Sequence, residues 1–102
     1  MEDYNQDNQI KIELDEETAL GTYANLAVIT HSSSEFILDF IRIMPGTPKA
    51  KVQSRVVLAP EHAKRLMMAL KDNINKYENA LGKIQLPEDM NLPPSLNVKG
   101  EA

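Results

Sequence analysis

Two histidines, three consecutive serines and a carboxylate within an apolar run are the residues whose types could support chemistry. His31 precedes the serine run 32–34 and Glu35 follows it, so a Ser/His/acid set can be drawn. However, no nucleophile elbow frames these serines, and such runs between strands are common turns. His62 and its neighbour Glu61 would point about 100° apart on a helix and could not chelate one ion together. We therefore expect no catalytic residue, no metal site and no cofactor, and interpret the protein as non-enzymatic.

Asp39 is the most unusual carboxylate, because it lies inside the strongly apolar run EFILDFIRIM. A buried carboxylate needs a cation or several N–H donors, or its pKa rises until it is neutral. Arg55 on the next predicted strand, or Arg42, could supply that cation. We expect an ion pair that fixes strand register or a subunit interface. A role in proton transfer and a wet position at the sheet edge are the alternatives.

Basic side chains could together form a phosphate-binding surface. They are Lys49, Lys51, Lys64, Arg65, Lys71 and Lys76. Phosphate binding requires these groups to converge, preferably beside aromatic rings. No ribonucleoprotein motif, zinc finger or glycine-rich phosphate loop accompanies them. A solvated face is the main expectation, and nucleic acid is a possible partner that the sequence does not favour.

The net charge of −4 is unevenly distributed. Residues 1–17 contain seven acidic residues and one lysine, whereas residues 18–86 contain nine basic and five acidic residues. The acidic arm could fold over the basic body, compete with an acidic partner, or serve solubility alone. The chain has no cysteine, which excludes disulfides and thiolate chemistry and fits a reducing compartment. With no leader sequence and no apolar run of membrane-spanning length, we expect a cytoplasmic protein without membrane contact.

The elements that must position these residues follow from the apolar periodicity. Strands are predicted where apolar residues recur at a period of two or cluster in runs of strand-forming residues, at 10–15, 22–30, 35–44 and 51–58. Between Pro60 and Gly82 the period becomes that of an amphipathic helix, with Pro suited to the first turn and Gly to the position after the last. Its apolar stripe consists of Ala63, Leu66, Met67, Leu70, Ile74, Tyr77 and Leu81.

The predicted fold is α+β: a four-stranded antiparallel meander, followed by one long amphipathic C-terminal helix packed on one face. Residues 9–84 are expected to form the single domain. An acidic mobile tail at 1–8 and a Pro-containing tail at 85–102 are expected to be disordered or extended.

The two central strands carry apolar residues on both faces. On the strand 35–44, Phe36, Leu38 and Phe40 point one way. Ile37, Ile41 and Ile43 point the other way, interrupted by Asp39. One helix can cover only one face of a sheet, so the second face needs another cover. We expect a homo-oligomer, with a dimer favoured. The alternative is a C-terminal tail that wraps beneath the sheet.

Several short motifs at matching spacing resemble one known family. They are Tyr23-x-Asn25, Ser34-Glu35-Phe36-x-Leu38-Asp39-Phe40, Pro45, Arg55-Val56-Val57-x-x-Pro60, Ala63-Lys64, Leu70, Asn73, Tyr77-Glu78 and Gly82-x-Ile84. The combination is similar to the small prokaryotic family named domain of unknown function 3467, over about residues 20–85. The resemblance implies a short, single-domain cytoplasmic protein, bacterial in type, with no established activity. No catalytic residue is transferred from it.

The function that fits these observations is a non-enzymatic, homo-oligomeric protein-interaction or accessory module with an unidentified protein partner. The alternative is a weak nucleic-acid-binding protein modulated by its acidic N-terminal arm.

Overall fold

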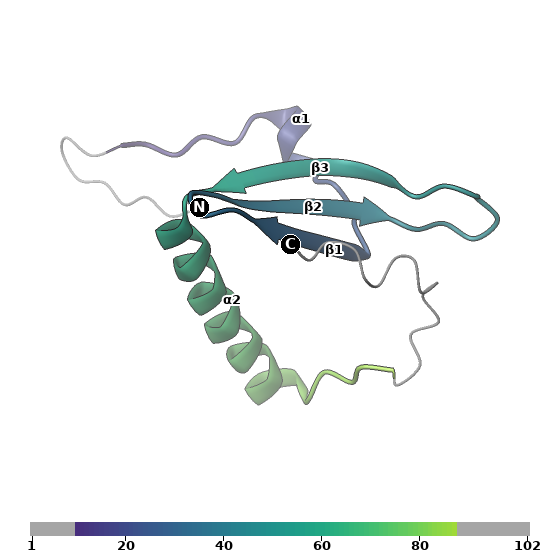
Figure 1. The fold of residues 1–102 in the computed structure, drawn as a ribbon. Helices are drawn as coiled ribbons and strands as arrows, with labels where there is room; N and C mark the ends of the chain where they lie inside the picture. The colour runs from purple at the N-terminus through teal and green to yellow at the C-terminus, as the bar shows by residue number, and fades with distance from the viewer. Residues whose placement is uncertain (1–9, 88–102) are drawn as a thin grey trace.

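The computed structural model describes residues 10–87, which form an antiparallel sheet of three strands followed by a long helix (Figure 1). In chain order the elements are α1 (Glu16–Ala19), β1 (Leu26–His31), β2 (Phe36–Arg42), β3 (Lys51–Leu58) and α2 (Pro60–Leu81). The α+β class, the antiparallel sheet and the C-terminal helix are confirmed. The predicted tail at 1–8 and residues 88–102 of the predicted tail at 85–102 lie outside the described residues.

The sheet is a meander in the order β1-β2-β3, because each connection is a turn between strands adjacent in sequence. Between β1 and β2 the serine run makes the turn: Ser32 Oγ accepts hydrogen bonds from the Ser34 and Glu35 amides at 3.1 and 3.3 Å. Between β2 and β3 the chain turns at Gly46, whose φ of +80° favours glycine. A bulge places Gln53 between the partners of Phe40 and Ile41.

The predicted first strand is wrong for the single chain: within the described residues, 10–15 pair with no other strand. The side chains of Ile10, Ile12 and Leu14 are 81, 52 and 62 % exposed. At Asp15 the chain enters the short helix α1, because the Asp15 carboxylate accepts a hydrogen bond from the Thr18 amide at 2.9 Å. A period of two marks a segment suited to a strand, but only a neighbouring sheet edge makes it one.

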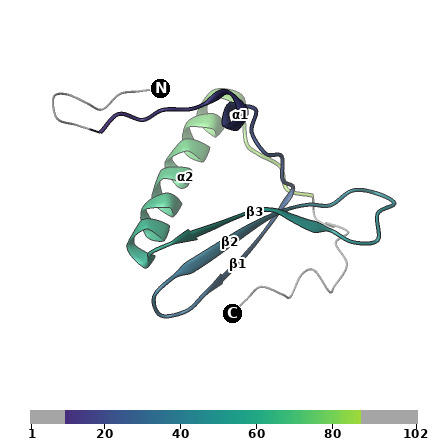
Figure 2. The same cartoon turned by 90° about the horizontal axis from the view of Figure 1, so that it is seen from above.

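The helix α2 has the predicted ends but not the predicted position. It begins at Pro60 and stops before Gly82, whose φ is +105° and whose amide donates to the Glu78 carbonyl at 3.0 Å. Only Ala59 separates β3 from α2, and the helix diverges from the sheet in both views (Figures 1 and 2). It therefore contacts β3 near its first turns and does not lie across a face of the sheet. Neither described helix is long and apolar enough to span a membrane.

The core of the single chain is small. Among the described residues, the buried hydrophobic side chains are Leu38 and Ile41, both on the central strand β2. They are three residues apart along the strand, and because successive side chains alternate, one lies on each face of the sheet. Each face of the sheet thus has one buried hydrophobic residue on the central strand, while apolar residues of the outer strands remain exposed.

Candidate interaction surface

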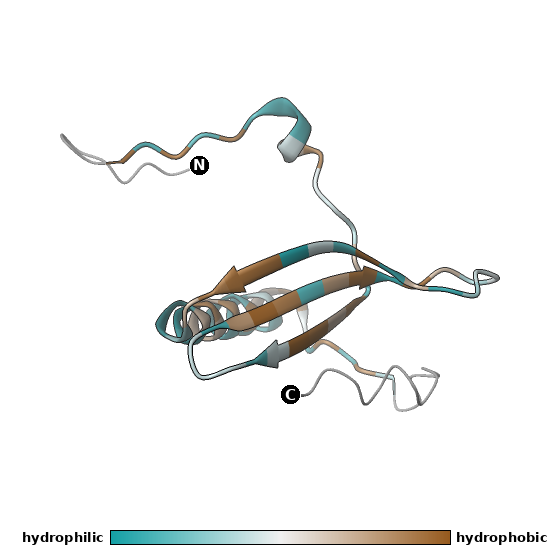
Figure 3. Ribbon diagram, turned by 45° about the horizontal axis from the view of Figure 1, so that its top comes forward, coloured by the Kyte–Doolittle hydropathy of each residue, from teal (hydrophilic) through white to brown (hydrophobic). Residues whose placement is uncertain are grey.

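The strand register assigns the side chains to two faces, because residues directly opposite in an antiparallel pair point the same way. One face, here called the phenylalanine face, comprises Ala27, Ile29, His31, Phe36, Leu38, Phe40, Ser54, Val56 and Leu58. The other, here called the Asp39 face, comprises Leu26, Val28, Thr30, Ile37, Asp39, Ile41, Val52, Arg55 and Val57. All three strands are therefore apolar over much of their length, with polar residues midway along β2 and β3 (Figure 3).

The phenylalanine face carries one histidine, which lies in an aromatic pair. His31 is opposite Phe36 in the register, and their rings stack with centroids 5.3 Å apart at 23°. The serines that follow His31 form the turn described above. The Ser/His/acid residues of this region therefore contribute packing and turn geometry. Nearby on the same face, Ile29 and Val56 remain 49 and 39 % exposed.

The Asp39 face is crossed by an ion pair between neighbouring strands. Arg55 donates from Nε to Asp39 Oδ1 at 2.7 Å and from a terminal nitrogen to Oδ2 at 2.9 Å. Asp39 lies on the central strand, so the edge position considered for it does not occur. These hydrogen bonds lower the pKa of Asp39 and raise that of Arg55, which keeps both groups charged.

The two candidate arginines have different partners in the structure. Arg55 lies directly opposite Asp39, and its side chain stays 60 % exposed while that of Asp39 is 12 % exposed. Arg42 instead lies at the end of β2, with its guanidinium carbon 5.8 Å from the centre of the Tyr23 ring. Strand register thus selects Arg55 as the cation for the buried carboxylate.

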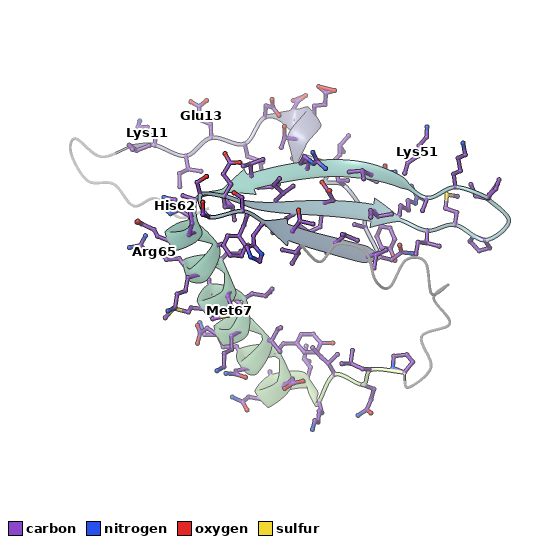
Figure 4. The ribbon with its side chains drawn as sticks, in the orientation of Figure 1. Lys11, Glu13, Lys51, His62, Arg65 and Met67 are labelled. Carbon is purple, nitrogen blue, oxygen red and sulfur yellow. The ribbon has the colours of Figure 1, made fainter. Side chains whose placement is uncertain are left out.

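The apolar stripe of α2, here called the helix stripe, faces solvent in the single chain. No residue of α2 is buried. Met67 and Leu70 are both 56 % exposed, and Ile74 is 39 % exposed (Figure 4 labels Met67). An amphipathic helix gains most of its stability from covering its apolar side. The helix stripe is therefore a surface that lacks its cover.

The predicted basic residues do not converge. Lys51 lies at one end of β3, whereas Arg65 lies on α2 beyond the other end of that strand (Figure 4). Eight strand residues separate the two ends by roughly 25 Å at 3.3 Å each. Lys49 precedes Lys51, and the remaining basic residues, Lys64, Lys71 and Lys76, are distributed along α2.

Two of these basic groups are paired locally on the helix. Arg65 contacts Glu61 at 2.9 Å and Lys76 contacts Asp72 at 3.5 Å, each one turn away. Such exposed pairs contribute little to stability but partly neutralise the charge. Within residues 10–87, no group of three or more His, Asp or Glu side chains is arranged to hold a metal ion.

One structural residue was not singled out by its chemistry in the sequence. The Asn25 side chain accepts from the Ile43 amide at 2.8 Å and donates to the Ile43 carbonyl at 3.1 Å. Its own amide donates to the Ile41 carbonyl at 2.9 Å. Asn25 thus continues the β1–β2 pairing beyond the end of the ladder. The motif Tyr23-x-Asn25 contained this residue, but its role required knowledge of the facing strand.

Comparisons with known proteins place the chain in a family without an assigned activity. One family model matches residues 1–86, so the match includes the acidic N-terminal arm that the motifs had left outside. Neither a curated protein nor a solved structure matches the chain. The chain therefore belongs to the family described as "Protein of unknown function (DUF3467)".

Proposed function

We propose that this protein is a non-enzymatic, homo-oligomeric module, with a dimer favoured, that serves protein interaction. The observation that carries the proposal is the uncovered helix stripe: Leu70, at the middle of a helix of 22 residues, is 56 % exposed. The second support is that both sheet faces are apolar while only Leu38 and Ile41 form a described hydrophobic core. A second copy presents the same surfaces and can cover them symmetrically.

The energetics favour this assignment over a free monomer. Burying apolar surface stabilises by roughly 25 cal/mol per Å², and a large apolar side chain by about 1.5–3 kcal/mol when fully covered. In a twofold dimer each interface residue is present in both copies, so its apolar surface is buried twice in the total. This gain must exceed an association cost of about 4–15 kcal/mol. Several half-exposed residues on each helix stripe, together with Ile29, Val56 and Val57 on the sheet, are available for burial. Covering them in both copies yields a free energy comparable to that association cost.

The nucleic-acid alternative has weaker support. Binding to phosphates increases with the number of cations that contact them together. Here Lys51 and Arg65 lie beyond opposite ends of β3, and Arg65 already contacts Glu61. The cysteine-free composition fits a cytoplasmic location, which remains part of the proposal.

The deciding experiment is the mass of the intact protein in solution, measured by light scattering during size-exclusion chromatography at several micromolar concentrations. We expect twice the 11.4 kDa chain mass, or a higher multiple. A mass of one chain across this range would contradict the proposal. A DNA or RNA oligonucleotide that bound in low salt and dissociated steeply with added salt would favour the alternative.

A further inference from the structure

Residues 10–15 have the pattern of a strand and lack a partner in the single chain. Ile10, Ile12 and Leu14 alternate with the charged residues Lys11, Glu13 and Asp15. Within the described residues, no backbone hydrogen bond joins 10–14 to the sheet. All three apolar side chains are more than half exposed. Such a segment becomes stable as a strand when it adds to an open sheet edge.

The outer side of β3 is the sheet edge that fits this segment. β3 is a terminal strand of the order β1-β2-β3, so its backbone pairs on one side only. Beyond the bulge at Gln53, residues 54–58 run regularly opposite β2, a stretch one residue shorter than the segment 10–15. The other edge strand, β1, has the sequence LAVITH and no Asp, Glu, Lys or Arg.

Charge also distinguishes the two edges. The segment offers the carboxylates of Glu13 and Asp15, and β3 offers the cations of Lys51 and Arg55. Arg55 uses Nε and one terminal nitrogen for Asp39, and its side chain remains 60 % exposed. With the segment antiparallel to β3 and Glu13 opposite Arg55 on the Asp39 face, Ile12 and Ile10 fall on the phenylalanine face opposite Val56 and Leu58, because strand side chains alternate. Lys11 then lies opposite Val57. One orientation therefore satisfies both the charged and the apolar residues.

The chain's own segment does not occupy this edge. It leaves the short helix α1 and runs apart from β3, as seen from above (Figure 2). Resting on the dimer proposed above, we propose that residues 10–15 of each copy add as a fourth strand to the β3 edge of the second copy. Exchange of identical strands about a twofold axis pairs the β3 edge of each copy with the segment of the other and leaves neither segment unpaired, so this exchange is complete at the dimer.

The test uses cysteine cross-linking, since the chain has no cysteine of its own. One protein carries Lys11→Cys and an affinity tag that changes its mass, and a second carries Val57→Cys. The matched control partner carries Thr30→Cys. Thr30 and Val57 both face Ile37, from β1 and β3 respectively, so they occupy equivalent positions on the two edge strands. Each pair is mixed, allowed to exchange, and treated with a short bismaleimide.

We expect a covalent heterodimer from the Lys11→Cys and Val57→Cys pair and much less from the Thr30→Cys control. Greater linkage to Thr30→Cys would overturn the assignment to β3. A chain carrying both Lys11→Cys and Val57→Cys should yield linked dimers, and a monomer closed by an internal link would mean that the segment pairs with its own sheet.

A second measurement does not depend on cross-linking geometry. Ile12→Asp should raise the dimer dissociation constant about 10- to 100-fold, because the side chain is buried only in the exchanged dimer. Ile12→Val, which keeps the residue apolar, should change it much less. A wild-type dimer that yields no heterodimer link, or that is unaffected by Ile12→Asp, would refute strand exchange and leave the homo-oligomer intact. A wild-type monomer would refute both.

Discussion

Arg55 and Asp39 face each other across β3 and β2, and two hydrogen bonds of 2.7 and 2.9 Å join the guanidinium to the carboxylate. The pair lies at the centre of the Asp39 face between Val28 on one side and the open edge of β3 on the other. A bidentate pair of this kind is directional, so it favours this register of β2 and β3 over a register shifted by one residue.

The first prediction concerns the pH dependence of stability. Hydrogen bonds from Arg55 lower the pKa of Asp39 below its ordinary value of 3.8. The folded state therefore holds the proton less tightly than the unfolded state, and the stability from the pair is present above pH 3.8 and lost as pH falls through the lower, folded value. Asp39→Asn should reduce the free energy of unfolding at neutral pH. It should also make the fall of that free energy on acidification smaller, because the titrating carboxylate is gone. Urea unfolding at a series of pH values measures both.

The control for this prediction is the other arginine. Arg55→Gln removes the cation that causes the shift, whereas Arg42→Gln removes only the contact with the Tyr23 ring. Arg55→Gln should therefore flatten the acid limb of the stability curve, and Arg42→Gln should leave its shape unchanged. An equal effect of both substitutions would show that general surface charge, and not this pair, governs the response to pH.

The second prediction concerns the helix stripe. Leu70→Asp places a charge on an apolar surface that is exposed in the single chain and, in the proposed dimer, covered. We expect the dimer dissociation constant to rise about 10- to 100-fold, as for loss of one buried side chain. Asn75→Asp introduces the same side chain on the polar side of α2 and should have little effect. Analytical ultracentrifugation of both variants checks this, and equal dissociation would argue against the stripe as an interface.

The third prediction concerns the end of the β1–β2 pairing. Asn25→Ala removes both side-chain hydrogen bonds to Ile43, each of which contributes a net amount of about 0.5–1.5 kcal/mol. We expect the free energy of unfolding to fall by about 1–2 kcal/mol and the Ile43 amide to exchange its hydrogen faster. Asn75→Ala on the exposed side of α2 should change stability by less than about 0.5 kcal/mol. Unchanged exchange at Ile43 would show that the two hydrogen bonds from the Asn25 side chain are not formed in solution.

The fourth prediction concerns the end of α2. Gly82 has a φ of +105°, and a Cβ added there would meet no atom within 4 Å. The cost of Gly82→Ala is therefore backbone strain alone, about 1–3 kcal/mol, because φ 105° with ψ 162° is a conformation almost confined to glycine. The substitution should expose the last turn of the helix to hydrogen exchange. Gly46→Ala, with a φ of +80° in the β2–β3 connection, should cost a similar amount without affecting α2. Fraying of α2 in both variants would contradict this separation.

The sequence by itself determined the local elements. The change from a period of two to a period of 3.6 at Pro60 located α2, and Gly82 marked its end, because these signals act through neighbours within one turn. The strand formers of 51–58 and the serine turn were equally local. For the same reason Asp39 could be identified as a carboxylate in need of a cation, since its apolar neighbours adjoin it in the sequence.

Only the tertiary structure decided which residues meet. In the structure Arg55, and not Arg42, pairs with Asp39. Lys51 and Arg65 lie beyond opposite ends of β3, and α2 diverges from the sheet that it was expected to cover. The structure also leaves residues 10–15 unpaired despite their strand pattern. The physical reason is common to all four: periodicity states that a surface is apolar or a strand is possible, whereas its cover or partner is a long-range contact that local sequence does not encode.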